Sequence, residues 1–114
     1  DARAPATMSE AAIAHIRGDI GFDGLLMTDD LSMKALSGSF EERTRRSIDA
    51  GCDVVLHCNG DRKEMIAIAD AAPLLSGPAL ARAEAAEDAR TQLDEFDVRS
   101  GLAKLDSLMA GVAS

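Results

Sequence analysis

Two short apolar runs, each preceded by a helical pattern, constrain the fold of this chain more than any other feature. The runs cover residues 25–28 and 53–56. Apolar residues recur at helical spacing over 9–19, and acids in a first turn with Gly51 as a stop indicate a second helix over 40–50. Such runs are typical of buried strands in a parallel sheet. With residues 30–39 as a long loop, the order helix, strand, loop, helix, strand predicts a right-handed parallel crossover unit. We therefore expect an α/β fold.

Beyond the second run, the chain shows helical patterns only. The predicted helices cover residues 62–72, 78–95 and 98–109. Pro73 is expected to end the first of them, and Pro78 suits the first turn of the next.

An acidic pair, Asp29 and Asp30, follows the first apolar run directly. In folds with parallel strands, chemistry is done at the carboxyl ends of the strands, which makes Asp29 a candidate catalytic carboxylate. Asp is also common after a strand as a turn former or as a helix N-cap, and this alternative stays open. If the strand continues, Asp30 points to the opposite side. We expect Asp30 to be structural, either capping the following turn or pairing with a basic residue.

Several motifs in this chain, taken together, resemble one enzyme family. They are Pro5-Ala6-Thr7-Met8-Ser9, Gly21-Phe22-Asp23-Gly24, Thr28-Asp29-Asp30-Leu31-Ser32-Met33, and Ala50-Gly51-Cys52-Asp53 ending in Leu56-His57-Cys58-Asn59. Their order and spacing resemble the bacterial β-N-acetylhexosaminidases of glycoside hydrolase family 3. The resemblance implies that Asp29 is the nucleophile of a retaining mechanism, which forms a covalent glycosyl-aspartate. Met33 is then an apolar wall of the sugar pocket, or it simply packs within its loop.

The resemblance also implies a fold that is larger than this chain. A complete (β/α)8 barrel needs about 200 to 250 residues, and the chain has 114. We therefore expect a partial (β/α)8 TIM barrel, namely the last two parallel strands with their helices, followed by C-terminal helices. The resemblance covers roughly residues 1–75, which we expect to be the C-terminal portion of the barrel, and leaves residues 76–114 as a C-terminal helical segment. The family's acid/base histidine lies in a Lys-His-Phe-Pro-Gly-like segment that is not found here. We expect a C-terminal fragment of the enzyme that is inactive on its own.

The substrate and setting are likewise implied by the resemblance. The partner is an N-acetylglucosamine-containing saccharide, with terminal N-acetylglucosamine hydrolysed from peptidoglycan-derived muropeptides during cell-wall recycling in the cytoplasm. The resemblance implies no metal or organic cofactor. The two histidines and two cysteines are scattered along the chain, which does not indicate a metal site.

Other polar residues near the second run receive structural interpretations. His57 ends the run, and we expect it to be a hydrogen-bonded structural residue rather than a catalytic one. Asn59 either orients a loop or caps the next helix, and capping is favoured. Cys52 and Cys58 lie near opposite ends of the second strand, too far apart to bond. We expect both to be reduced, buried thiols of a cytosolic protein.

The formal net charge of −8 argues against nucleic acid or an anionic membrane as a partner. No apolar stretch is long enough to span a bilayer. Two parallel strands leave two open edges, so we expect the isolated chain to self-associate. Two further functions stay open: a non-enzymatic oligomeric α/β interaction module, and a small-ligand α/β binding domain that uses the same strand ends.

Overall fold

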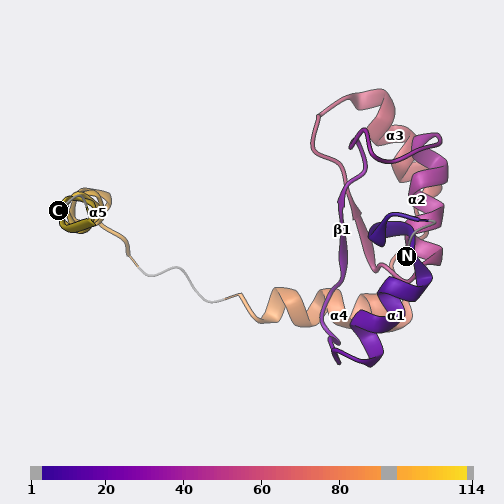
Figure 1. The fold of residues 1–114 in the computed structure, drawn as a ribbon, viewed down its shortest axis with the longest axis horizontal. Helices are drawn as coiled ribbons and strands as arrows, with labels where there is room; N and C mark the ends of the chain where they lie inside the picture. The colour runs from indigo at the N-terminus through magenta and orange to yellow at the C-terminus, as the bar shows by residue number, and fades with distance from the viewer. Residues whose placement is uncertain (1–3, 91–94, 113–114) are drawn as a thin grey trace.

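The computed structural model describes residues 4–90 and 95–112, in which helices lie beside a small sheet and the last helix is drawn apart from it (Figure 1). The elements are η1 Ala6–Met8 (a 3-10 turn), α1 Glu10–Gly18, β1 Met27–Asp30, α2 Phe40–Asp49, β2 Val54–Leu56, α3 Arg62–Ala71, α4 Gly77–Asp88 and α5 Val98–Val112. Strands and helices alternate up to α3 and helices alone follow, which confirms the predicted α/β class.

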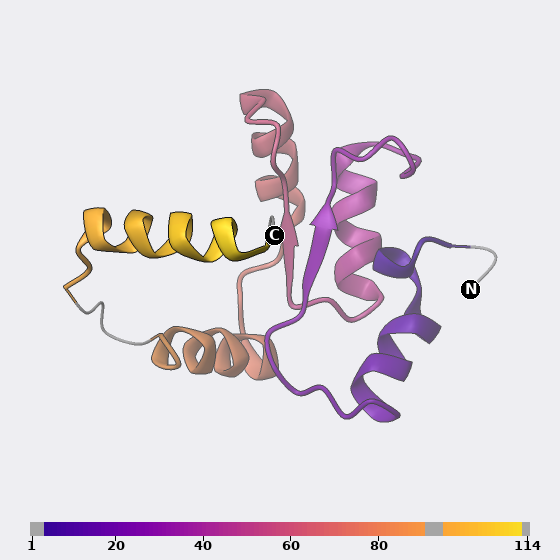
Figure 2. The same ribbon diagram turned by 60° about the vertical axis from the view of Figure 1, so that its left-hand side comes forward.

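The two strands lie side by side and run in the same direction, as Figure 2 shows. The connection between them passes through α2, so the pair is the predicted parallel crossover. α2 packs against α3 and against η1, which places these three elements together. The sheet of the described residues is open, and no barrel is seen in it. The partial (β/α)8 barrel stays a prediction, as does the division into residues 1–75 and 76–114.

Short polar side chains set the starts of three helices. Ser9 accepts a backbone N–H at the start of α1, and Ser39 and Glu42 form a reciprocal capping box at the start of α2. Asp61 accepts two backbone N–H groups at the start of α3. The prediction that Asn59 caps this helix is therefore wrong. Asn59 instead accepts the N–H of Asp61 at 2.8 Å and so orients the loop before the helix.

The first strand lies later in the chain than its apolar run predicted. β1 spans Met27–Asp30, whereas the run indicated 25–28. The carbonyl of Leu26 accepts the Asp53 N–H at 2.8 Å, so contact between the two strand segments begins just before β1. Met27 is 53% exposed, and exposed and buried positions alternate along the strand. The apolar run therefore leads into the strand and is not itself the buried strand.

The C-terminal helices also differ from their predicted bounds. α4 ends at Asp88, whereas the spacing predicted 78–95. Acidic residues crowd the last turn of α4, where the helix dipole disfavours negative charge. Residues 91–94 of the predicted helix lie outside the described residues. α5 continues past 109 to Val112.

No helix in the described ranges has the length and apolarity needed to cross a membrane.

The hydrophobic core is thin, because much of the apolar content of the chain is Ala, which buries little area per residue. Its buried residues form two clusters. The first joins η1, the loop after β1 and α3, and the second joins α1 to the end of α2. The clusters are Met8, Leu31, Leu36 and Ile68, and Ile13, Ala50 and Cys52.

A buried ion network holds the amino ends of both strands. The Asp53 side chain, 4% exposed, accepts from Arg17 of α1 at 2.6 Å and from Arg82 of α4 at 3.0 Å. It also accepts the Leu26 N–H at 2.8 Å, and Arg82 reaches Asp23 at 2.8 Å. Burial raises the pKa of Asp53, but the hydrogen bonds from Leu26 and the two arginines outweigh burial and hold the pKa below its ordinary value.

We predict that Asp53→Asn lowers the free energy of unfolding by about 3 kcal/mol near neutral pH, because the two arginines lose their buried counter-charge. Since the folded-state pKa of Asp53 is depressed, its contribution is present above the unfolded pKa of about 3.9 and is lost as the pH falls through the folded value. Urea unfolding at several pH values should show that the stability difference between the two proteins is full above about pH 4 and shrinks as the pH falls below it. A stability difference that is constant down to about pH 2 would contradict this assignment.

Gly51 ends α2 in a conformation that other residues rarely adopt. Its N–H donates to the Ile48 carbonyl at 2.9 Å, and the Cys52 N–H donates to the Ser47 carbonyl at 3.1 Å, which is the Schellman arrangement. The φ angle of Gly51 is +109°, and an added Cβ would lie 2.9 Å from Ile13 Cγ2. Both the backbone and the neighbouring core therefore require glycine at this position.

We predict that Gly51→Ala destabilises the protein by about 1–3 kcal/mol, because it adds backbone strain and crowds Ile13. Gly18→Ala is the matched control. Gly18 lies in α1, and an added Cβ meets nothing within 4 Å, so this change should be neutral or stabilising by up to about 1 kcal/mol. Thermal unfolding compares the two variants, and equal shifts in their melting temperatures would contradict the prediction.

Candidate active site

The pairing register of β1 and β2 shifts where the predicted site residues lie. Met27 faces Val54 and Asp30 faces Leu56, so β1 holds one residue more than β2 between these two pairs. An extra residue of this kind makes a β-bulge, which bends the strand and re-aims its side chains, often beside an active site. The bulge falls on the two residues between Met27 and Asp30.

Asp29 lies on the exposed side of this bulge. One carboxylate oxygen, Oδ1, accepts the backbone N–H of Asp30 at 2.7 Å, which orients the group. The alternative that Asp29 caps the next helix is wrong, because Ser39 caps α2. The structure therefore presents Asp29 as an exposed carboxylate, oriented by the backbone, at the carboxyl end of a parallel strand pair.

Asp30 points to the opposite face, as predicted. Its Oδ1 accepts the N–H of Ser32 at 2.9 Å and the N–H of Cys58 at 3.1 Å, and its Oδ2 accepts the Ser32 hydroxyl. The bonds from Ser32 are the main reason that the pKa of Asp30 lies below its ordinary value. Asp30 therefore caps the turn after β1 and ties it to the end of β2, which confirms its structural role.

The loop between β1 and α2 is held by one arginine of α2. Arg43 donates to three backbone carbonyls: Leu31 at 2.6 Å, Leu36 at 2.7 Å and Gly38 at 3.1 Å. Leu31 and Leu36 are also buried in the core. Met33 is 41% exposed on this loop, and its role as a wall of a sugar pocket stays a prediction. The sequence analysis missed Arg43, since no local spacing pattern relates an arginine to carbonyls of a preceding loop.

His57 connects the loop after β2 to the surrounding helices. Its Nε2 lies 2.7 Å from Glu64 Oε2, and its side chain is 7% exposed. The ring packs edge-on against Phe40 at 5.6 Å between centroids, and Asn59 donates to the same oxygen of Glu64 at 2.6 Å. These contacts confirm that His57 is hydrogen-bonded and packed among structural neighbours.

The two cysteines are free thiols in different environments. Cys52 is buried as predicted, and burial raises the pKa of its thiol. Cys58 is exposed, so the prediction that it is buried is wrong. The reason is that β2 ends at Leu56, which places Cys58 on the surface loop. Within residues 4–90 and 95–112, no group of three or more His, Cys, Asp or Glu side chains is placed to hold a metal ion.

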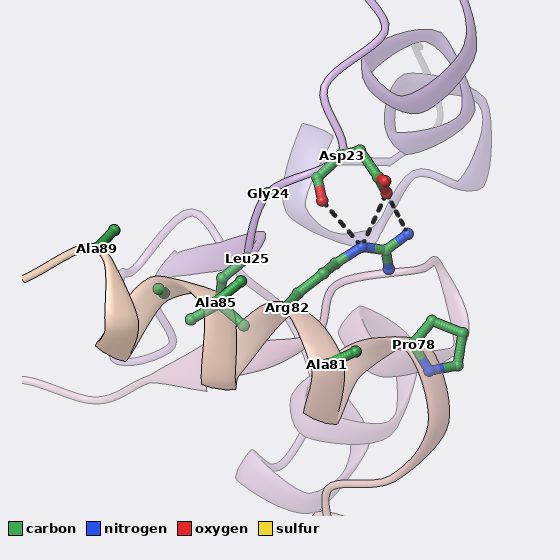
Figure 3. A pocket seen from close by; sticks show the side chains of 9 residues that line it. Asp23, Gly24, Leu25, Pro78, Ala81, Arg82, Ala85 and Ala89 are labelled. Carbon is green, nitrogen blue, oxygen red and sulfur yellow. Dashed lines mark hydrogen bonds and ion pairs between the residues drawn. The ribbon is translucent and has the colours of Figure 1, made fainter.

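A groove of about 530 Å³ lies at the other end of β1, between α4 and residues 23–25 (Figure 3). Its lining is mostly small and apolar, with several alanines of α4 and Leu25. Arg82 reaches from α4 to bind Asp23 beside it. Asp29 does not line this groove. The carboxylate lies instead on the open surface at the carboxyl end of the sheet.

Comparison with known proteins identifies the family of the chain. The family described as "Glycosyl hydrolase family 3 N terminal domain" matches residues 1–90. The chain belongs to glycosyl hydrolase family 3. This family-3 match includes the bulged strand, the Arg43-held loop and the Asp53 network, and it stops before α5.

Curated relatives match a shorter part of this family-3 chain. A "Beta-hexosaminidase" of Tolumonas auensis is 41% identical over 71 residues, which cover 60% of this chain and 20% of the relative. One of Neisseria meningitidis is 48% identical over 58 residues, which cover 48% of this chain and 16% of the relative. One of Nitrosospira multiformis is 38% identical over 69 residues, 58% of this chain and 20% of the relative. The matched part is thus a fifth or less of each relative's length.

The matched family description refers to an N-terminal domain. The comparisons therefore do not support the prediction that the family-3 chain is a C-terminal fragment. The relatives agree with the resemblance drawn from the acidic pair and its neighbouring motifs, but they assign no role to Asp29 or Met33. Both site residues stay predictions.

Proposed function

We propose that the protein carrying this chain is a retaining β-N-acetylhexosaminidase with Asp29 as its nucleophile. The observation that carries the proposal is the β-bulge at the end of β1, which presents an oriented carboxylate on the exposed side of a parallel strand pair. Membership of glycosyl hydrolase family 3 supports the same chemistry. The relatives named above are all beta-hexosaminidases.

A carboxylate in this position can carry out both steps of a retaining reaction. Asp29 attacks the anomeric carbon, the leaving group departs with a proton from an acid, and water then hydrolyses the glycosyl-aspartate. The negative charge also stabilises the oxocarbenium-like transition state. Because Oδ1 accepts the Asp30 N–H, we assign the attack to Oδ2.

Most of the sugar site, including its acid, lies on other segments of the barrel in this proposal. An open two-stranded sheet leaves Asp29 on a surface, whereas a complete (β/α)8 barrel places its active site among eight loops at the carboxyl ends of its strands. We propose that β1 and β2 are the last two of these strands and that Met33 forms an apolar wall. The acid/base histidine comes from an earlier loop of that barrel, so the isolated chain is inactive.

The substrate in this proposal is a saccharide with a terminal N-acetylglucosamine, in particular a muropeptide derived from peptidoglycan. The family membership and the named relatives support an N-acetylhexosamine-containing glycan in general. Cell-wall recycling in the cytoplasm and a reaction without metal or organic cofactor complete the proposal.

We predict that Asp29→Asn in the full-length protein lowers kcat for an aryl N-acetylglucosaminide by about 10⁴-fold or more, because an amide cannot form the glycosyl-enzyme. Asp70→Asn is the matched control, since Asp70 is an exposed acid on α3. It should leave the rate unchanged. Mass spectrometry after trapping with a fluorinated sugar should locate the adduct on Asp29. Near-normal turnover by Asp29→Asn, or an adduct on another residue, would remove Asp29 from the mechanism.

We predict that the isolated chain self-associates. Each strand of the two-stranded sheet has an open edge that can pair with another copy, and α5 exposes several large apolar side chains, among them Leu105 at 53%. Sedimentation velocity should show species larger than a monomer at micromolar concentration. Leu105→Glu distinguishes association through α5 from association through the strand edges, because only association through the strand edges persists in this variant. A monodisperse monomer of the unaltered chain would contradict the prediction.

A further inference from the structure

The β-bulge that presents Asp29 is completed by side chains. The N–H of Leu56 on β2 donates to the hydroxyl oxygen of Thr28 at 3.0 Å. The N–H of Asp30 donates to the carboxylate of Asp29 at 2.7 Å. A backbone bond follows at the next residue, where the Leu31 N–H donates to the Leu56 carbonyl at 2.9 Å. A threonine hydroxyl on β1 therefore takes part in the strand pairing at the bulge.

Thr28 is largely shielded from solvent where its hydroxyl oxygen accepts the Leu56 N–H. The residue is 5% exposed, and it lies on the buried side of β1 while its neighbour Asp29 lies on the exposed side. A buried N–H that loses its acceptor carries the full cost of desolvation. Removing the hydroxyl would therefore leave the Leu56 N–H without this acceptor and favour a change in the pairing of the strands.

The direction of Asp29 is sensitive to that pairing. Side chains alternate between the two faces of a strand, so a slip of one residue moves every side chain to the other face. On the far side of the bulge, Asp30 is bound to Ser32 and to Cys58 on the loop after β2, which fixes the register there. Thr28 fixes the register at the residue before Asp29. Asp29 therefore lies between two residues, Thr28 and Asp30, whose side chains are hydrogen-bonded.

We propose that Thr28 is a positioning residue for Asp29, because its hydroxyl holds the bulge that aims the carboxylate at the anomeric carbon. This inference rests on the proposed role of Asp29 as nucleophile. Thr28 does not touch the sugar in this proposal. Its loss therefore slows the chemical step and leaves substrate binding almost unchanged.

The test compares Thr28→Val with Thr28→Ser in the full-length protein. Valine has the shape of threonine without the hydroxyl, and serine keeps the hydroxyl. Misplacement of a reacting group by about 1 Å can cost about 10²-fold, so Thr28→Val should lower kcat, and the rate of trapping by a fluorinated sugar, by about 10- to 100-fold with little change in KM. Thr28→Ser should restore most of the rate. If the valine variant does not fold, Thr28→Ala removes the same hydroxyl without adding bulk.

Amide hydrogen exchange gives a readout that does not depend on activity. The Leu56 amide should exchange faster in Thr28→Val, or in Thr28→Ala, than in the unaltered protein and in Thr28→Ser. An unchanged exchange rate, an unchanged kcat in the variants without the hydroxyl, or an equal loss in Thr28→Ser would each overturn the positioning role. If Asp29→Asn keeps its activity, the proposed nucleophile is wrong; if only Asp29→Asn is impaired, the nucleophile stands and the role of Thr28 is refuted.

Discussion

The buried carboxylate of Asp53 is the interaction on which the rest of this structure depends. The apolar clusters are small, and a buried ion pair contributes less net stability than well-packed apolar residues do. Its main effect is on geometry. Asp53 binds Arg17 of α1 and Arg82 of α4, so one side chain sets the places of two helices beside the strands. It also accepts the Leu26 N–H, while the Leu26 carbonyl accepts the Asp53 N–H.

This reciprocal bonding has a consequence at the far end of the sheet. Leu26 and Asp53 are matched at the amino ends of the strands, and Asp30 and Leu56 are matched at the carboxyl ends. Between these two matches β1 has one residue more than β2, so the strands can pair at both ends only if the extra residue is taken up between them. The two fixed ends therefore require an extra residue between them, at the bulge that exposes Asp29. The stabilising network and the candidate active site occupy opposite ends of β1, but the pairing of the strands couples them.

Local patterns in the sequence were enough to predict the elements, and non-local contacts decided what the patterns missed. The start of α2 was placed correctly from the acids in its first turn, and the structure adds a capping box of Ser39 and Glu42 at this point. The start of β1 was placed too early because an apolar run marks hydrophobicity and carries no information on pairing. The bonds from Arg82 to Asp53, and from the Leu56 N–H to Thr28, join residues 29 and 28 positions apart. No periodicity in a single sequence reports such contacts.

The acidic pair itself shows how position on a strand divides two roles between residues of the same type. Neighbouring carboxylates repel each other, and the alternation of the strand directs Asp29 and Asp30 to opposite faces. The charge of Asp30 is met by hydrogen bonds from Ser32 and Cys58, which lower its pKa and keep it ionised as an anchor. Among the residues that the structure describes, Asp29 accepts a backbone N–H on Oδ1 only, so its second oxygen is available for chemistry. A lone aspartate could supply the exposed carboxylate, but without its neighbour the turn would lose its bond to the Cys58 N–H on the loop after β2. Asp30 therefore contributes to the arrangement that leaves Asp29 available for the reaction.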